Sequence, residues 1–262
     1  MHYRFFAPVV AAFAVSSVAV SMPAIARADD SPVTMKYIAK VGDVEHQQVL
    51  MKAMVQGIDA VVKNTQKRTV KDVKDTGETT YLVTDEGGTM TLMGNDQVQP
   101  AGPDVTIKRD KTGKIIDWKP AMDINGALSP ELMRTLAQLY TLILPTDAVK
   151  TNDKWKVELD NPLFKDKKIK IENTYLGLEK VDGVSLWKIK QTTSVPTDGE
   201  GGIATFEGTF WLKPETAQAI KIEGAAKEVP SQFGKLSFTV VVSPVKDDKP
   251  VAPVVAPPAA PK

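Results

Sequence analysis

Apolar and polar residues alternate along the chain from Trp155 to Val242, and this alternation constrains the fold more than any other feature. The alternating segments are about ten residues long and are separated by turn signals. Because successive side chains of a strand point to opposite faces, each segment can bury one face and expose the other. The pattern therefore predicts an antiparallel meander of strands.

The strands of this meander are expected where apolar residues mark one face. These residues are Ile169, Ile171 and Tyr175; Trp187 and Ile189; Phe206, Phe210 and Leu212; Ile220 and Ile222; and Leu236, Phe238, Val240 and Val242. Residues 181–183, 198–202 and 213–216 have the composition of turns. Each strand is therefore expected to pair with the next.

The same pattern continues before residue 129, although less regularly. It predicts strands at residues 35–41, 47–56, 58–73, 79–84, 89–93, 105–109 and 114–118, with turns at Gly77, Gly87-Gly88 and Thr112-Gly113. Residues 49–55 also fit a helical spacing, but their alternation and the interruption at Gly57 favour a strand.

One segment between the two halves has a helical period instead. Ser129 is a good N-cap, Pro130 suits the first helical position, and Glu131 places a negative charge near the N-terminus. A helix is expected over residues 129–144, ended by Pro145, with an apolar stripe of Leu132, Leu136, Leu139, Tyr140 and Ile143. The stripe is expected to cover the apolar face of a sheet; a ligand gate and a membrane-surface helix are the alternatives.

These segments together predict a mainly β (α+β) fold: a large curved antiparallel sheet or half-barrel with one amphipathic helix on the concave face. Residues 29–243 are expected to form this single domain. Residues 1–28 are expected to be a signal peptide that is cleaved before Asp29, which leaves no stable membrane span and predicts a periplasmic or extracellular location. Residues 244–262 contain six prolines and predict a disordered spacer, or alternatively a docking tail for an envelope protein.

The amino-acid composition excludes several kinds of binding site. The chain has no cysteine, and His46 is the one histidine after processing, so neither disulfides nor a multi-histidine or thiolate metal site can form. Residues 29–262 carry 31 basic and 32 acidic side chains, a net charge of −1, without the basic patch that a nucleic-acid partner requires. We therefore expect no metal, no cofactor and no nucleic acid.

Catalytic patterns are also missing from the sequence. No Gly-x-Ser-x-Gly elbow and no Gly-Lys-Ser/Thr phosphate loop occurs. A pair of strand carboxylates among Glu172, Glu179, Glu207 and Glu223 could converge, but most of them are flanked by alternating lysines and are interpreted as members of cross-strand ion pairs. These observations favour a protein that is not an enzyme, with no catalytic residue.

The segment after the helix resembles a known pattern. Leu144-Pro145, Val149 and Asn152-Asp153-Lys154-Trp155 are similar to uncharacterised exported bacterial β-proteins in which a Val-x-x-Gly-Asp-x-Trp turn follows the helix; here Asn152 replaces the glycine. Such proteins are similar in outline to periplasmic lipoprotein carriers and lipid-binding lipoproteins, whose curved sheet and covering helix enclose an apolar cavity. The resemblance implies a binding function.

We therefore expect a non-catalytic binding protein of the cell envelope for a lipid or another hydrophobic molecule. The alternative is a structural or protein-interaction module whose core is filled by its own side chains. Methionine and aromatic side chains suit the wall of a pocket for an irregular apolar ligand. The pocket candidates are Met51, Met54, Met93, Leu136, Leu139, Tyr140, Ile143, Trp187, Phe206 and Phe210.

Overall fold

The computed structural model describes residues 31–55, 57–121, 130–198, 200–231 and 234–245. Within these residues the chain forms one 12-stranded antiparallel sheet and a short helix, which confirms the predicted mainly β fold. The strands are β1 (Val44–Val55), β2 (Ile58–Val73), β3 (Thr79–Leu92), β4 (Asn95–Gln99), β5 (Val105–Arg109), β6 (Ile115–Pro120), β7 (Lys154–Asp160), β8 (Lys168–Val181), β9 (Val184–Pro196), β10 (Ile203–Leu212), β11 (Ala219–Ser231) and β12 (Gly234–Pro244).

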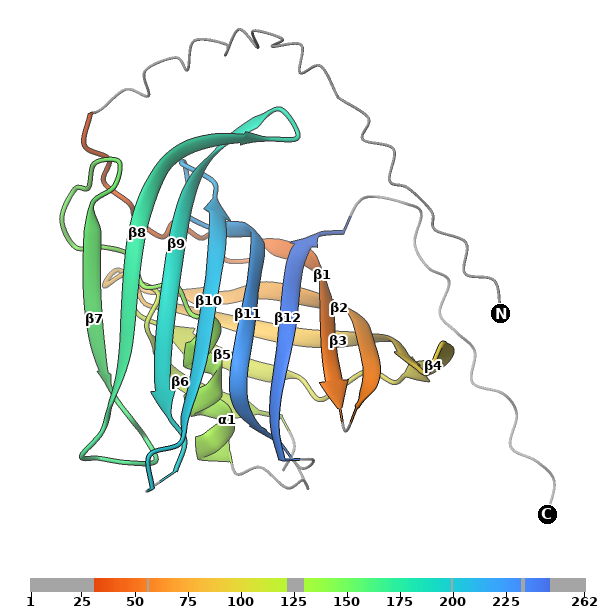
Figure 1. Cartoon of the computed structure of the whole chain (residues 1–262). Coiled ribbons are helices and arrows are strands. Elements are labelled where there is room, and N and C mark those ends of the chain that lie inside the picture. Colours follow the sequence, from red (N-terminus) through yellow and green to blue (C-terminus); the bar gives the residue numbers. More distant parts are fainter. Residues whose placement is uncertain (1–30, 56, 122–129, 199, 232–233, 246–262) are drawn as a thin grey trace, which may run out of the picture.

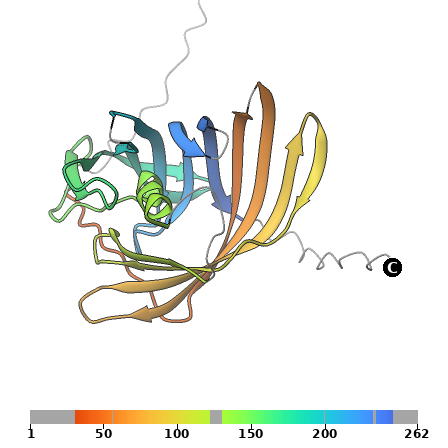
Figure 2. The ribbon, with the colours of Figure 1, turned by 90° about the horizontal axis from the view of Figure 1, so that it is seen from below.

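Both halves of the sequence share this one sheet. The strand order is β6-β5-β3-β2-β1-β12-β11-β10-β9-β8-β7, and β4 pairs with β3. The halves meet where β1 pairs with β12, so that Met51 lies opposite Val240. The sheet curves strongly, and the helix α1 (Pro130–Ala137) lies inside the curve (Figures 1 and 2).

The predicted strands of the second half are confirmed, and the alternation of buried and exposed residues is clearest in β8. In β8, Ile169, Ile171 and Tyr175 are buried, whereas the intervening Lys170 and Glu172 are exposed. The predicted β8–β9 turn is closed by two residues with positive φ, Asp182 at 49° and Gly183 at 84°. One face of β8 is therefore packed and the other is solvated.

The structure corrects two details of the first half. Residues 35–41 do not form a strand; Val33 makes an isolated bridge with Val149, and the Ile38 amide donates to the Thr216 carbonyl at 3.0 Å, because this segment crosses the end of the sheet. Gly87-Gly88 is not a turn, and β3 continues through it. A Cβ atom at Gly88 would lie 1.9 Å from the Lys63 carbonyl oxygen, so glycine permits the close approach of β2 at a bulge.

The helix ends earlier than the sequence predicts. After α1, residues 138–140 form the 3-10 helix η1 (Gln138–Tyr140), and residues 141–144 have no regular secondary structure. The backbone groups of this segment bond to distant partners: the Leu144 amide donates to the Thr112 carbonyl at 2.8 Å, and the Trp155 indole donates to the Ile143 carbonyl at 2.9 Å. These tertiary bonds replace the last helical turn. Ser129 lies outside the described residues.

Neither of the described helices is long and apolar enough to cross a membrane. The expected signal peptide and most of the expected tail lie outside the described residues, as does the expected cleavage site. The turn at Asn152 is confirmed, because this residue adopts a positive φ of 72° where the related pattern has glycine.

Candidate functional site

The segment that covers the concave face, residues 130–144, packs over one side of the sheet. In it, η1 contacts β9 and β10, and Leu139 is fully buried. Six of the pocket candidates lie in the resulting core: Leu136, Leu139, Ile143, Trp187, Phe206 and Phe210. Tyr140 and Met51 are partly buried and pack against this core. This side of the concave face is therefore filled by the protein's own side chains.

The centre of this core is an aromatic cluster. The ring centroids of Phe206 and Phe210 lie 6.2 Å apart, and those of Tyr140 and Phe238 lie 6.4 Å apart. Phe206 has room for its ring because Gly208 and Gly224 lie beneath it; a Cβ atom at Gly208 would be 2.3 Å from the ring. Sequence reasoning missed these glycines, although glycine at an inward-facing strand position is a signal for such close approach.

The other side of the concave face is less completely covered. Met51 of β1 lies opposite both Val240 and Val62, and Val62 lies opposite Met90, so these side chains share the inner face. We call a group of five half-buried apolar residues on the inner face of β1 to β3 the apolar wall. The apolar wall consists of Val49, Met51, Ala53, Val62 and Met90.

A cavity of about 330 Å³ lies between the covering segment and strands β2, β3, β5 and β6. We call it the inner cavity. It is lined by Gln66, Val83, Val105, Ile107, Arg109, Ile115, Trp118, Ala137, Tyr140 and Thr141. Most of these side chains are apolar, but one carries a full positive charge. Sequence reasoning identified Tyr140 and missed the rest of this lining.

Two of the sequence candidates do not join the others. Met54 is 62% exposed and alternates with the inward Ala53, so it lies on the outer face. It lines, together with Ala53 and Phe238, a shallow depression of about 410 Å³ between β1, β2, β11 and β12. Met93 is 75% exposed at the β3–β4 turn, where its φ is 51°. The structure therefore brings only Met51 of the three methionine candidates to the concave side.

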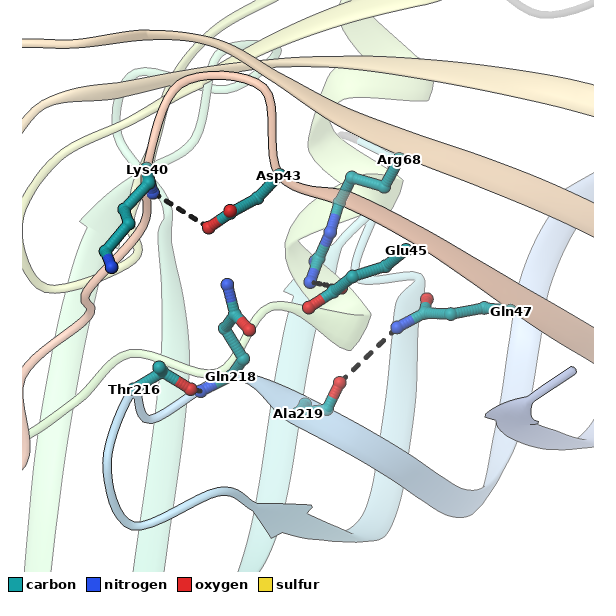
Figure 3. Close-up of polar contacts among 8 residues, drawn as sticks. All are labelled: Lys40, Asp43, Glu45, Gln47, Arg68, Thr216, Gln218 and Ala219. Carbon is teal, nitrogen blue, oxygen red and sulfur yellow. Dashed lines mark hydrogen bonds and ion pairs between the residues drawn. The ribbon is translucent and has the colours of Figure 1, made fainter.

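The inner face becomes polar toward the opposite end of β1 and β2. Figure 3 shows an ion pair between Glu45 and Arg68, beside Gln47, whose Nε2 donates to the Ala219 carbonyl at 3.4 Å. The Arg68 and Arg109 guanidinium groups lie 5.2 Å and 5.8 Å from the centroid of the Tyr81 ring. The ring thus contacts two cations, which its negative face favours.

Arg109 is the least compensated charge of this region. Burial lowers the pKa of its guanidinium, an effect that Tyr37 opposes and the positive charge of Arg68 reinforces, but arginine stays protonated in proteins. Its Nε is buried and has no hydrogen-bond partner among the described residues. No described carboxylate lies within 4.0 Å of it, whereas Arg68 is paired with Glu45.

The predicted ion pairs on the outer face are confirmed. The Nζ to Oε distances are 2.7 Å for Lys156–Glu172, 2.5 Å for Lys188–Glu179, 2.5 Å for Lys190–Glu207 and 2.7 Å for Lys221–Glu223. His46 is also on the surface, with Nδ1 3.4 Å from Glu86. In the described part of the chain, no group of three or more His, Cys, Asp or Glu residues could hold a metal ion.

Comparison with known proteins gives structural neighbours only. The chain is similar to the hypothetical lipoprotein YmcC from Escherichia coli (K12), with 11% identity, a TM-score of 0.26, and coverage of 79% of this chain and 92% of that one. It is also similar to a putative outer membrane lipoprotein-sorting protein domain from Vibrio parahaemolyticus, with 10% identity, a TM-score of 0.22, and coverage of 78% and 83%. The first neighbour is named a lipoprotein, and the second a domain of a lipoprotein-sorting protein.

No family model and no curated protein matches the chain. At TM-scores this low, the structural likeness carries no weight for the function of this chain. The function has to be inferred from the chain's own residues.

Proposed function

We propose that this chain is an exported, non-catalytic binding protein for a lipid or another hydrophobic molecule. The observation that carries the proposal is the partial cover of the concave face. The covering segment packs on β9 and β10, while Val49, Met51 and Ala53 of the apolar wall stay half-buried. An apolar ligand on this wall removes its remaining exposed area from water, which contributes about 25 cal/mol per Å².

The position of Tyr140 supports a site between the covering segment and the wall. Its ring packs against the buried Phe206 on one side and also lines the inner cavity. Burial raises the pKa of the Tyr140 hydroxyl, so this group stays neutral at physiological pH and adds no charge to the cavity. A ligand can therefore contact both the covering segment and the sheet.

Matched methionine variants on one strand test the proposal. Uptake of the neutral apolar fluorophore N-phenyl-1-naphthylamine is measured for the wild type, Met51→Lys and Met54→Lys. We expect Met51→Lys to weaken uptake at least about tenfold, because the new charge enters an apolar site. Met54→Lys is expected to leave uptake unchanged, because Met54 is exposed on the outer face. Uptake that is absent in the wild type, or equal in all three proteins, contradicts the proposal.

A ligand from the native host provides a second test. Native mass spectrometry of protein purified from its own host should show an additional mass beside that of the polypeptide. The protein-interaction module remains the alternative, because the aromatic cluster fills one side of the concave face without a ligand. Deletion of residues 246–262 separates the two: loss of localisation with unchanged fluorophore uptake favours a docking role for the tail.

A further inference from the structure

The inner face of β1 changes from polar to apolar along the strand. Its inward residues are Glu45 and Gln47 at one end and Val49, Met51 and Ala53 at the other. Strand β2 repeats the change in register, because Gln66 lies opposite Gln47 and Val62 lies opposite Met51. The two strands therefore present one polar end and one apolar end on the same surface.

The inner cavity meets this surface at Gln66, which belongs to both. From Gln66, the inner face of β2 passes Asn64 and reaches Val62 of the apolar wall, a distance of about 13 Å along an extended strand. Arg109 lines the same cavity from β5. A single molecule of moderate length can thus contact the guanidinium of Arg109 and the apolar wall at once.

Arg109 has no carboxylate partner among the described residues at the polar end. Asp85 of β3 lies opposite Gln66, but its carboxylate accepts hydrogen bonds from Asn64 and the Gly87 amide. Two guanidinium groups contact Tyr81, but Glu45 is the one described carboxylate in ion-pair contact with them, and it pairs with Arg68. Arg109 is half-buried, but its Nε is buried and has no hydrogen-bond partner among the described residues, which is costly for a polar group. The planar fork of arginine matches a carboxylate or a phosphate.

We propose that the ligand is an anionic amphiphile whose carboxylate or phosphate head binds Arg109 in the inner cavity and whose aliphatic chain lies on the apolar wall. This inference rests on the proposed function and names the chemical class of the ligand. The head supplies the missing negative charge beside Arg109. The chain covers Val62 and Met51, whose side chains are half-buried without it.

The test compares three probes with the same alkyl chain. Dodecanoate, dodecyl phosphate and dodecanol each displace N-phenyl-1-naphthylamine from the wild type, Arg109→Gln, Arg109→Lys and Lys63→Gln. Lys63 is the matched control, because it carries the same charge on β2 but is exposed on the outer face. Thermal unfolding of every variant shows whether it is folded.

We expect the wild type to bind at least one of the two anions about tenfold or more tightly than dodecanol, since hydrogen bonds to charged groups contribute that much. The anion that binds more tightly shows whether the head group is a carboxylate or a phosphate. Arg109→Gln is expected to lose the preference while dodecanol binding stays the same. Arg109→Lys should retain part of the preference, and Lys63→Gln should retain all of it.

Equal binding of anions and alcohol by the wild type overturns the head-group assignment and leaves the proposed function standing. The same conclusion follows if Arg109→Gln keeps the preference. If no probe binds the wild type, the proposed function itself fails. If Arg109→Gln does not fold, the comparison of probes in the wild type still decides whether the ligand is anionic, and Arg109→Lys tests whether its head binds at Arg109.

Discussion

The ring centroids of Tyr140 and Phe206 lie 5.3 Å apart with their planes at 80°, an edge-to-face contact between the covering segment and β10. We expect a double-mutant cycle with Tyr140→Leu and Phe206→Leu to give a coupling of about 0.5–1.5 kcal/mol in the free energy of unfolding, measured by urea denaturation. A coupling near zero would show that this contact does not stabilise the packing of the covering segment on the sheet.

Gly208 is expected to tolerate no larger side chain while Phe206 is present. A Cβ atom at Gly208 would lie 2.3 Å from the Phe206 ring, so Gly208→Ala should lower the free energy of unfolding by about 1–3 kcal/mol through overpacking. The cost should shrink in a Phe206→Leu background, where the ring is absent. An equal cost in both backgrounds contradicts the proposed steric cause.

Leu139 and Leu178 provide a matched pair of truncations. Leu139 of η1 is 0% exposed and Leu178 of β8 is 54% exposed. Leu139→Ala is expected to cost about 2–5 kcal/mol of stability, because it leaves a cavity beneath the cover. Leu178→Ala should cost about 0.5 kcal/mol or less. If chemical denaturation gives the same loss of stability for both variants, the covering segment does not pack on a buried core.

Lowering the pH should destabilise the β9–β10 turn. The Asp198 carboxylate accepts hydrogen bonds from the amides of Gly202 at 2.6 Å and Glu200 at 3.0 Å, which lower its pKa below 3.8. Because the folded-state pKa lies below the unfolded one, the stabilisation is present above the unfolded pKa and is lost as the pH falls through the folded pKa. Carbon NMR of the Asp198 carboxyl group should show the low pKa; a midpoint at or above 3.8 contradicts the prediction.

The strands were predictable where one face is fully buried. In β8, buried Ile169 and Ile171 alternate with exposed lysines, so the period of two residues is visible in the sequence itself. The pairing of β1 with β12 was not predictable, because it joins residues almost 200 positions apart through register alone. The early end of the helix also depends on distant residues, since Thr112 and Trp155 bind the backbone of residues 143–144.

The candidate site was predictable in its aromatic part and not in its charged part. Phe206 and Tyr140 follow the apolar periods of their segments and meet in the core. Met54 was grouped with Met51 by residue type, but the alternation of β1 places the two on opposite faces. Arg109 is in phase with the inward Ile107, a signal that sequence reasoning passed over because strand cations are mostly solvated.

Methionine methyl NMR during a titration with dodecanoate tests the concave binding site most directly. The methyl signals of Met51 and Met90 on the apolar wall should shift with the added ligand, while those of Met54 and Met93, which are 62% and 75% exposed elsewhere, should not. Shifts at Met54 or Met93 with none at Met51 would contradict a ligand site on the concave face.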